Sequence, residues 1–234
     1  MINSTSSFKK IVILVILLAI PGLLYYLLQE KGKNRYHPLG IFGPKQVSST
    51  FHSKRGKQIP DTIYHTIRNF ELTDQDGESY SFPADSNRIT VVNFFFTRCP
   101  SFCTDMNKEM ARVAGQYSKN SFLRFISITV NPEYDSPQIL KKYASKFKLP
   151  KEKWRFLTGP QDSIYHLARQ DFIVDAIQDS TRADNFIHSP MLILLDPQKR
   201  IRGYYDSTNK EQVDKLADEI KVLIAEELRK VKNP

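Results

Sequence analysis

Residues 91–103 read VVNFFFTRCPSFC and decide the fold. The run from Ile89 to Phe96 is β-branched and aromatic with almost no polar side chains, which is typical of a central parallel strand covered on both faces. Just after it, Cys99 and Cys103 stand four residues apart, and they are the only two cysteines among the 234 residues. The sequence therefore predicts a buried strand that delivers two thiols to the start of a helix.

Pro100 suits the first turn of a helix, so we expect both sulfurs on one helix face, at positions i and i+4. The free N–H groups and the positive end of the helix dipole would stabilise a thiolate there, and Arg98 adds a positive charge beside Cys99. Cβ atoms at this spacing lie about 5–6 Å apart, whereas a relaxed disulfide needs about 3.5–4.5 Å. The pair is predicted either to form a disulfide with some distortion or to bind a metal. Two inert structural cysteines are the alternative.

The composition predicts one packed domain of about 150–190 residues with an appendage. Hydrophobic residues make up 41% of the chain and aromatic residues 12%, which supports a core and argues against a disordered chain. The formal net charge is +9, but nearly half of it comes from residues 1–36. No cluster of Lys and Arg is interleaved with aromatic residues, so we do not expect nucleic-acid binding.

An apolar segment of eighteen residues runs from Ile11 to Leu28 without a charge. That length is at the threshold for a membrane span and exceeds the usual apolar core of a signal peptide. No small-x-small cleavage site follows it. We therefore expect an uncleaved transmembrane anchor at residues 1–28, with the rest of the chain on the extracytoplasmic (periplasmic) side; a cleaved signal is the alternative. Residues 29–60, rich in Gly, Pro, Lys and Ser, are predicted to be a tether.

In residues 61–232, apolar runs typical of strands alternate with helical periodicity. Strands are predicted over residues 66–72, 79–82, 89–96, 123–130, 154–157, 172–176, 191–195 and 201–205. Helices are predicted after residues 100, 136, 160 and 208, the last with a capping box formed by Thr208 and Glu211. Met106 and Met110 follow the helical period of their apolar neighbours, which indicates core side chains and not metal ligands. This order predicts a three-layer α/β domain.

His188 is the candidate third ligand because it lies directly before the predicted strand 191–195. A loop that enters a central strand can reach the same end of the sheet as the cysteine loop. Two thiolates and one imidazole form a soft set of low coordination number, which Cu(I) accepts readily, whereas structural zinc needs a fourth ligand that we do not find. A lone histidine is more often a solvated loop residue. We do not predict a ligand role for the other four histidines, His37, His52, His65 and His166.

Four motifs follow one another in the body of the chain: FFTRCPSFC at 95–103, SITVNPEYDSP at 127–137, FLTG at 156–159, and HSP with LLDP between 188 and 197. In order and spacing they resemble the Sco/SenC family over roughly residues 60–228. The resemblance implies a thioredoxin-like fold with copper bound by Cys99, Cys103 and His188. It also implies a role at the dinuclear CuA centre of respiratory cytochrome c oxidase, either delivering copper or keeping its cysteines reduced.

The chain departs from the family pattern in three places. Thr104 stands where a proline often follows the second cysteine, and Asn131 and Tyr134 replace an acid and an arginine of the second motif. Pro190 stands where thioredoxins carry their cis-proline, which would favour disulfide exchange. All three ligands remain.

The leading hypothesis is a copper metallochaperone and not a turnover enzyme. Cys99, Cys103 and His188 would hold Cu(I) or Cu(II) and pass it by ligand exchange to the copper-receiving subunit of the oxidase, with a thiol reductant keeping the cysteines reduced. The alternative is a membrane-anchored thiol-disulfide oxidoreductase whose redox pair reduces cysteines of a partner; dedicated reductases use the shorter Cys-x-x-Cys spacing. Phe96 disfavours a peroxidase, and Thr104 excludes haem attachment.

Overall fold

The computed structural model of the chain describes residues 4–31, 38–54, 56–83, 87–100, 102–174, 176–178 and 186–232. The chain divides into two compact units, Met1–His37 and Pro38–Pro234. In the first unit, helix α1 spans Ser4–Lys31. Its side chains are described only at positions 9–10 and 12–26. Across the described residues, no helix combines the length and the apolar character that a membrane crossing requires.

The second unit is built on a seven-stranded sheet with the strand order β11-β10-β5-β6-β7-β3-β4. β5, β6 and β7 run parallel to one another, and the outer strands β10, β11, β3 and β4 are antiparallel to their neighbours. Every residue of β5 is buried, as predicted for a central strand. The bounds are β3 Phe70–Asp74, β4 Ser79–Phe82, β5 Ile89–Phe95, β6 Leu123–Thr129, β7 Trp154–Thr158, β10 Met191–Leu195 and β11 Ile201–Asp206.

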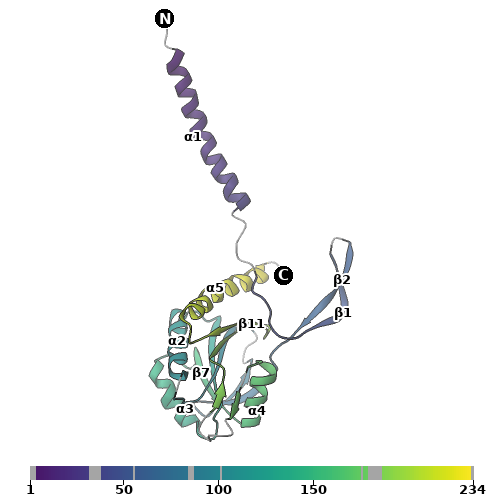
Figure 1. Cartoon of the computed structure of the whole chain (residues 1–234), viewed down its shortest axis with the longest axis vertical. Helices are drawn as coiled ribbons and strands as arrows, with labels where there is room; N and C mark the ends of the chain where they lie inside the picture. The colour runs from purple at the N-terminus through teal and green to yellow at the C-terminus, as the bar shows by residue number, and fades with distance from the viewer. Residues whose placement is uncertain are drawn as a thin grey trace. The chain divides into compact units, whose positions relative to one another are not determined.

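Helices cover both faces of this sheet, with α2, α3 and α5 along one face and α4 on the other (Figure 1). Alternate residues of β5 reach the two layers, because successive side chains of a strand point to opposite faces. Phe95 packs on Tyr143 of α3, whereas Phe94 packs edge to face on Phe172 beyond α4, with ring centroids 5.3 Å apart. This confirms the predicted three-layer domain. The bounds are α2 Cys103–Gln116, α3 Pro137–Ala144, the 3-10 turn η1 Ser145–Phe147, α4 Gln161–His166, the π-helical turn η2 Leu167–Asp171 and α5 Lys210–Lys232.

The buried hydrophobic core of the described residues draws only on positions between Ile67 and Leu223, all in the second unit. Met106 and Met110 are 1% and 0% exposed, which confirms that they are core residues. Because this unit contains the whole of that core, residues 38–234 are expected to fold without the first 37.

Part of the segment predicted as a tether forms an antiparallel hairpin of β1 (Lys45–Lys54) and β2 (Lys57–Tyr64). Gly43, at the base of the hairpin, has a φ of 99°. A Cβ atom there would lie 2.8 Å from the Cβ of His65, so only glycine fits without a shift. The backbone N–H of His65 donates to the carbonyl of Pro44 at 3.2 Å and closes the base.

The predicted strand over residues 172–176 is wrong. The backbone N–H groups of Phe172 and Val174 bond back to carbonyls of η2, each at 3.0 Å, so this segment continues the end of the helix. Ile173 between them has a φ of 55°. The chain becomes extended only at β8 (Ala176–Gln178), which pairs antiparallel with β9 (Phe186–His188) as a separate two-stranded sheet.

Candidate functional site

The loop between β5 and α2 carries the two cysteines in different settings. Helix α2 begins at Cys103, with Phe102 at the cap position. Cys99 lies in the turn before the helix, where its N–H donates to the carbonyl of Phe96 at 3.3 Å. The prediction that both sulfurs share one helix face is therefore wrong, because the helix begins only at Cys103.

The two thiols are in contact and are unequally buried. Both cysteines are in the thiol form; Cys99 is partly buried, and Cys103 is 1% exposed. Burial, and after it the hydrogen bond between the two side chains, raises the pKa of the Cys103 thiol far above its ordinary value. Arg98, expected beside Cys99 as a stabilising charge, has its guanidinium over the ring of Tyr134, 3.4 Å from the centroid. The thiolate predicted at this helix start is therefore not the favoured form of Cys103.

Asp135 holds the cysteine loop against the loop that follows β6. Its carboxylate is fully buried and accepts hydrogen bonds from the backbone N–H of Thr97 at 3.0 Å, from the hydroxyl of Thr97 and from the hydroxyl of Thr129 at 2.5 Å. Thr97 stands two residues before Cys99, so the carboxylate fixes the direction in which the chain leaves β5. Sequence reasoning did not assign Asp135 this role, although it belongs to the quoted motif NPEYDSP.

A buried chain of polar side chains anchors the first turns of α2. Asn93 accepts from the hydroxyl of Ser127 at 2.6 Å and donates to Asn107 at 2.8 Å, and Asn107 donates to the hydroxyl of Tyr143 at 3.0 Å. Burial raises the pKa of Tyr143 to about 12, so its hydroxyl stays neutral. Because Asn107 lies one helical turn after Cys103, this network positions the buried cysteine. The amide side chain of Asn93, within a run that is otherwise apolar from Val91 to Phe96, was the sequence signal for this network.

The backbone of His188 ends β9, opposite Ala176. β10 is antiparallel to β5, with Ile193 opposite Val92. The chain that enters β10 therefore lies at the end of the sheet where β5 delivers the cysteines, as the sequence led us to expect. The side chain of His188 lies outside the described residues. Within the described part of the chain, no group of three His, Cys, Asp or Glu side chains is arranged to hold a metal ion.

The peptide bond before Pro190 does not have the cis form expected from the likeness to thioredoxins. Among the described residues, the only cis peptide bond precedes Pro83.

Of the other histidines, His37 lies outside the described residues and His52 lies on the hairpin. His65 and His166 belong to a cluster around Asp171. A ring nitrogen of His65 lies 2.6 Å from the carbonyl oxygen of Asp171, and one of His166 lies 2.6 Å from the guanidinium of Arg68. Arg68 donates to the carboxylate of Asp171 from its backbone and its side chain, at 2.8–3.2 Å.

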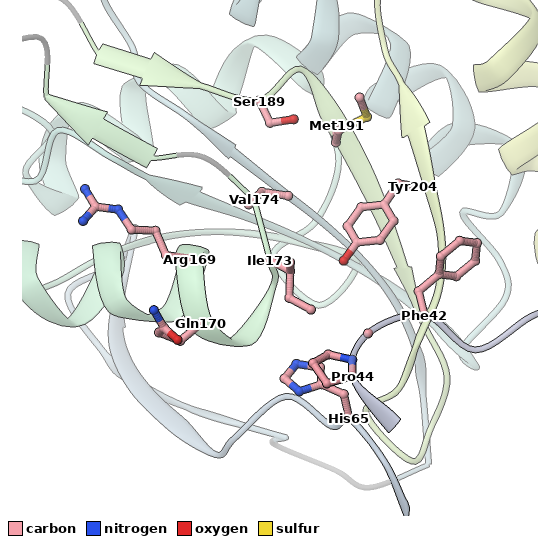
Figure 2. Close-up of a pocket in the computed structure, with 11 residues that line it drawn as sticks. Phe42, Pro44, His65, Arg169, Gln170, Ile173, Val174, Ser189, Met191 and Tyr204 are labelled. Atoms are coloured by element: carbon pink, nitrogen blue, oxygen red, sulfur yellow. The ribbon is translucent and has the colours of Figure 1, made fainter. Parts of the chain in front are cut away.

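A groove of about 750 Å³ lies beside the segment that follows His188 (Figure 2). Ser189 and Met191 line it from the start of β10, and Ile173 lines it from the end of η2. Residues at the base of the hairpin also line the groove. The other lining residues are Phe42, Gly43, Pro44, His65, Arg169, Gln170, Val174 and Tyr204.

Comparison with known proteins gives consistent matches. A family model described as SCO1/SenC matches residues 60–225. The SCO1 protein homolog of Bacillus subtilis is 28% identical over 168 residues, which cover 71% of this chain and 86% of the homolog. BsSco, described as a cytochrome c oxidase assembly protein of the Sco family with a disulfide switch, has a solved structure. It matches with a TM-score of 0.59 at 28% identity and covers 67% of this chain and 92% of BsSco.

Arabidopsis thaliana ScoI, solved with copper bound, matches with a TM-score of 0.56 at 25% identity. The match covers 66% of this chain and 97% of ScoI. These structural matches confirm the predicted α/β thioredoxin-like fold.

Proposed function

This chain belongs to the SCO1/SenC family, and on that premise we propose that it is a copper metallochaperone for assembly of the CuA centre of cytochrome c oxidase. The observation that carries the proposal is the contact between Cys99 and Cys103 at the end of β5. The backbone that leads from His188 into β10 lies at the same end of the sheet. Two similar proteins also support the proposal: BsSco is described as a cytochrome c oxidase assembly protein, and Arabidopsis ScoI was solved with copper bound.

Copper is the cargo in this proposal, held by Cys99, Cys103 and His188. Thiolates and a neutral imidazole suit Cu(I), and the imidazole also suits Cu(II). Because burial raises the pKa of Cys103, the incoming metal must displace the proton of this thiol, and binding releases that proton to solvent. Cys99 is the less buried of the two cysteines, so a thiolate of the acceptor protein would reach the metal on its side. Transfer then proceeds by exchange of one ligand at a time.

Thiol-disulfide exchange is the second candidate, favoured by the contact between the two thiols. In this reaction Cys99 and Cys103 lose two electrons and two protons and form a disulfide, while the disulfide of a partner is reduced to two thiols. A thiol reductant then restores the pair. This activity would not need His188, which separates it from copper delivery.

We also propose that the segment Ile11–Leu28, whose ends lie outside the described side chains, anchors the domain to a membrane with the body on the extracytoplasmic side. The support is the uncharged segment Ile11–Leu28 within a helix of 28 residues, which is about 42 Å long. Its described apolar side chains are exposed, for example Leu17 at 66% and Leu18 at 69%. Full-length chain is expected in the carbonate-washed membrane fraction, and recovery in the wash would contradict the anchor.

The test is a copper titration of reduced residues 38–234. We expect one copper per chain. Cys99→Ser, Cys103→Ser and His188→Ala should each weaken binding by about 100-fold or more, since even groups that only orient a ligand change metal affinity by about 10- to 100-fold. His52→Ala is the matched control and should leave binding unchanged. If His188→Ala binds copper with unchanged affinity, and Cys99 and Cys103 reduce a disulfide, the metallochaperone proposal is rejected in favour of the oxidoreductase.

A further inference from the structure

Exposed apolar side chains of the second unit gather in one region. Among its described residues, seven large apolar side chains are exposed, and six of them lie on the hairpin or beside the groove at its base. They are Phe42 (46%), Val47 (76%), Phe51 (61%), Ile59 (37%), Ile63 (53%) and Ile173 (43%), and we call this set the apolar surface. The seventh, Leu228, lies on α5. A concentration of this kind marks an interaction site, because scattered single residues are the usual pattern.

The groove connects the base of the hairpin to the start of β10, which lies at the cysteine end of the sheet. Pro44 and His65 line the groove, and they are the residues directly before β1 and directly after β2. Ser189, the residue after His188, lines the same groove. Figure 2 shows Ile173, Val174 and Tyr204 between the hairpin base and Ser189. A partner that contacts the hairpin and fills the groove therefore extends to Ser189, the residue after the proposed ligand.

Ile173 is the strained member of the apolar surface. Its φ of 55° is a genuine outlier for a β-branched residue, and it follows a π-helical turn, a feature often found at functional sites. Its side chain is 43% exposed, so core packing does not explain an isoleucine there. Glycine would adopt this φ without strain, but the chain has an isoleucine whose side chain lines the groove. Such strain is expected where the side chain is needed for binding.

The charges around the apolar surface are positive. Of the groove residues, Arg169 is basic and none is acidic. The hairpin has lysines at Lys45, Lys54 and Lys57 and one acid, Asp61. That acid accepts a hydrogen bond from the hydroxyl of Thr50 and lies 2.7 Å from a ring nitrogen of His52. The complementary partner therefore carries carboxylates around an apolar centre.

The register of the hairpin favours a protein partner over a lipid surface. Val47 is opposite Thr62 and Phe51 is opposite Pro60, so both side chains point to one face. Ile59 and Ile63 fall on the other face because side chains alternate along β2. A hairpin that lies on a membrane surface would be apolar on one face only, whereas the cleft of a partner protein can contact both faces of the hairpin. A second copy of this chain would bring like charges together across a two-fold axis.

We propose that the apolar surface is the docking site for the protein that receives the copper, with an apolar side chain of that acceptor seated in the groove and its carboxylates facing Lys45 and Arg169. This inference rests on the proposed function and adds the surface by which the acceptor is recognised. It places one end of the docking site at Ser189, the residue after the proposed ligand His188.

The test measures binding of residues 38–234 to the purified apo CuA domain of a cytochrome c oxidase by isothermal titration. Phe51→Ser and Ile173→Gly should each weaken binding about tenfold or more, since buried anchors dominate interface energies. Leu228→Ser, an exposed apolar residue outside the apolar surface, is the matched control and should bind like the wild type. Ile173→Gly should also unfold at an equal or higher urea concentration, because glycine relieves the positive φ.

Three results would overturn the inference. Binding of both variants with wild-type affinity is one, and an equal loss in Leu228→Ser is the second. The third is that residues 38–234 sediment with anionic phosphatidylglycerol vesicles and that Phe51→Ser abolishes this sedimentation. That result would show that the apolar surface binds a membrane. Each measurement is made with the copper-loaded and the metal-free chain. A wild type that binds no copper refutes the proposed function, while the comparison of variants still decides the docking site.

Discussion

Replacing Asp135 by asparagine tests whether one buried carboxylate holds the cysteine loop in place. The two oxygens of Asp135 accept three hydrogen bonds, two from Thr97 and one from Thr129. Asparagine has nearly the same shape but presents an NH₂ group in place of one oxygen. At least one of the three donors then faces another donor. The hydroxyls can rotate towards new partners, but the backbone N–H of Thr97 cannot.

The structure sets the size of the expected loss. A hydrogen bond to a charged group contributes about 1.5–3 kcal/mol, and a buried donor left without an acceptor costs about 1–3 kcal/mol. In the variant, one donor has no acceptor, and the other two donors bond to a neutral oxygen in place of a charged one. Asp135→Asn should therefore lower the free energy of unfolding by about 2–4 kcal/mol. The same change frees the backbone two residues before Cys99, so copper affinity should fall as well.

Urea unfolding of residues 38–234 measures the first effect, and copper titration measures the second. Asp105→Asn is the matched control, because Asp105 lies two residues after Cys103, is 77% exposed and pairs with the exposed Lys108. Such a surface pair contributes about 0–0.5 kcal/mol. If Asp135→Asn unfolds within about 1 kcal/mol of this control, Asp135 does not clamp the loop and the reasoning is refuted.

Three further outcomes are expected. Gly43→Ala should destabilise the domain by about 1–3 kcal/mol in urea unfolding, because it combines a positive φ with a 2.8 Å approach to His65. Burial tends to raise the pKa of Asp171, but hydrogen bonds and charge from Arg68 outweigh it and hold this pKa below the usual value. The pairing therefore stabilises the fold above about pH 4 and is lost as the pH falls through the folded pKa, so Arg68→Gln should flatten the decline in stability between about pH 5 and 3. Copper binding in weak buffer should release the Cys103 proton, and affinity should fall at least about tenfold per pH unit on acidification.

The layers of the domain could be predicted because their signals are local. The apolar runs that became β5, β6 and β10 show their burial in the residues themselves, and Met106 and Met110 follow the period of a helix with one buried face. Local signals were less accurate at element ends. Helix α5 is capped by Asn209, whose side chain accepts the N–H of Glu211 at 2.9 Å, one residue later than the predicted cap at Thr208.

The start of α2 could not be predicted because contacts from distant parts of the chain determine it. Pro100 and the cysteine spacing favoured a helix from residue 100. The loop is instead held at Thr97 by Asp135, which is 38 residues away. The same limit applies to the protonation of Cys103: the helix start and Arg98 argued for a thiolate, but burial, which depends on the packed layers, outweighs them. Neither effect is visible in a short segment of sequence.

The unequal burial of the two thiols bears on how copper would leave the site. A copper carrier must bind the metal and also release it. At least one of its ligands should therefore have a stable metal-free form. Burial favours the protonated form of Cys103, and therefore opposes the thiolate that copper requires. When an acceptor thiolate displaces Cys99, the more accessible ligand, the remaining bond to Cys103 competes with reprotonation of a thiol that is stable when neutral. Within the proposed function, protonation of the buried cysteine therefore accompanies the release of copper to the acceptor.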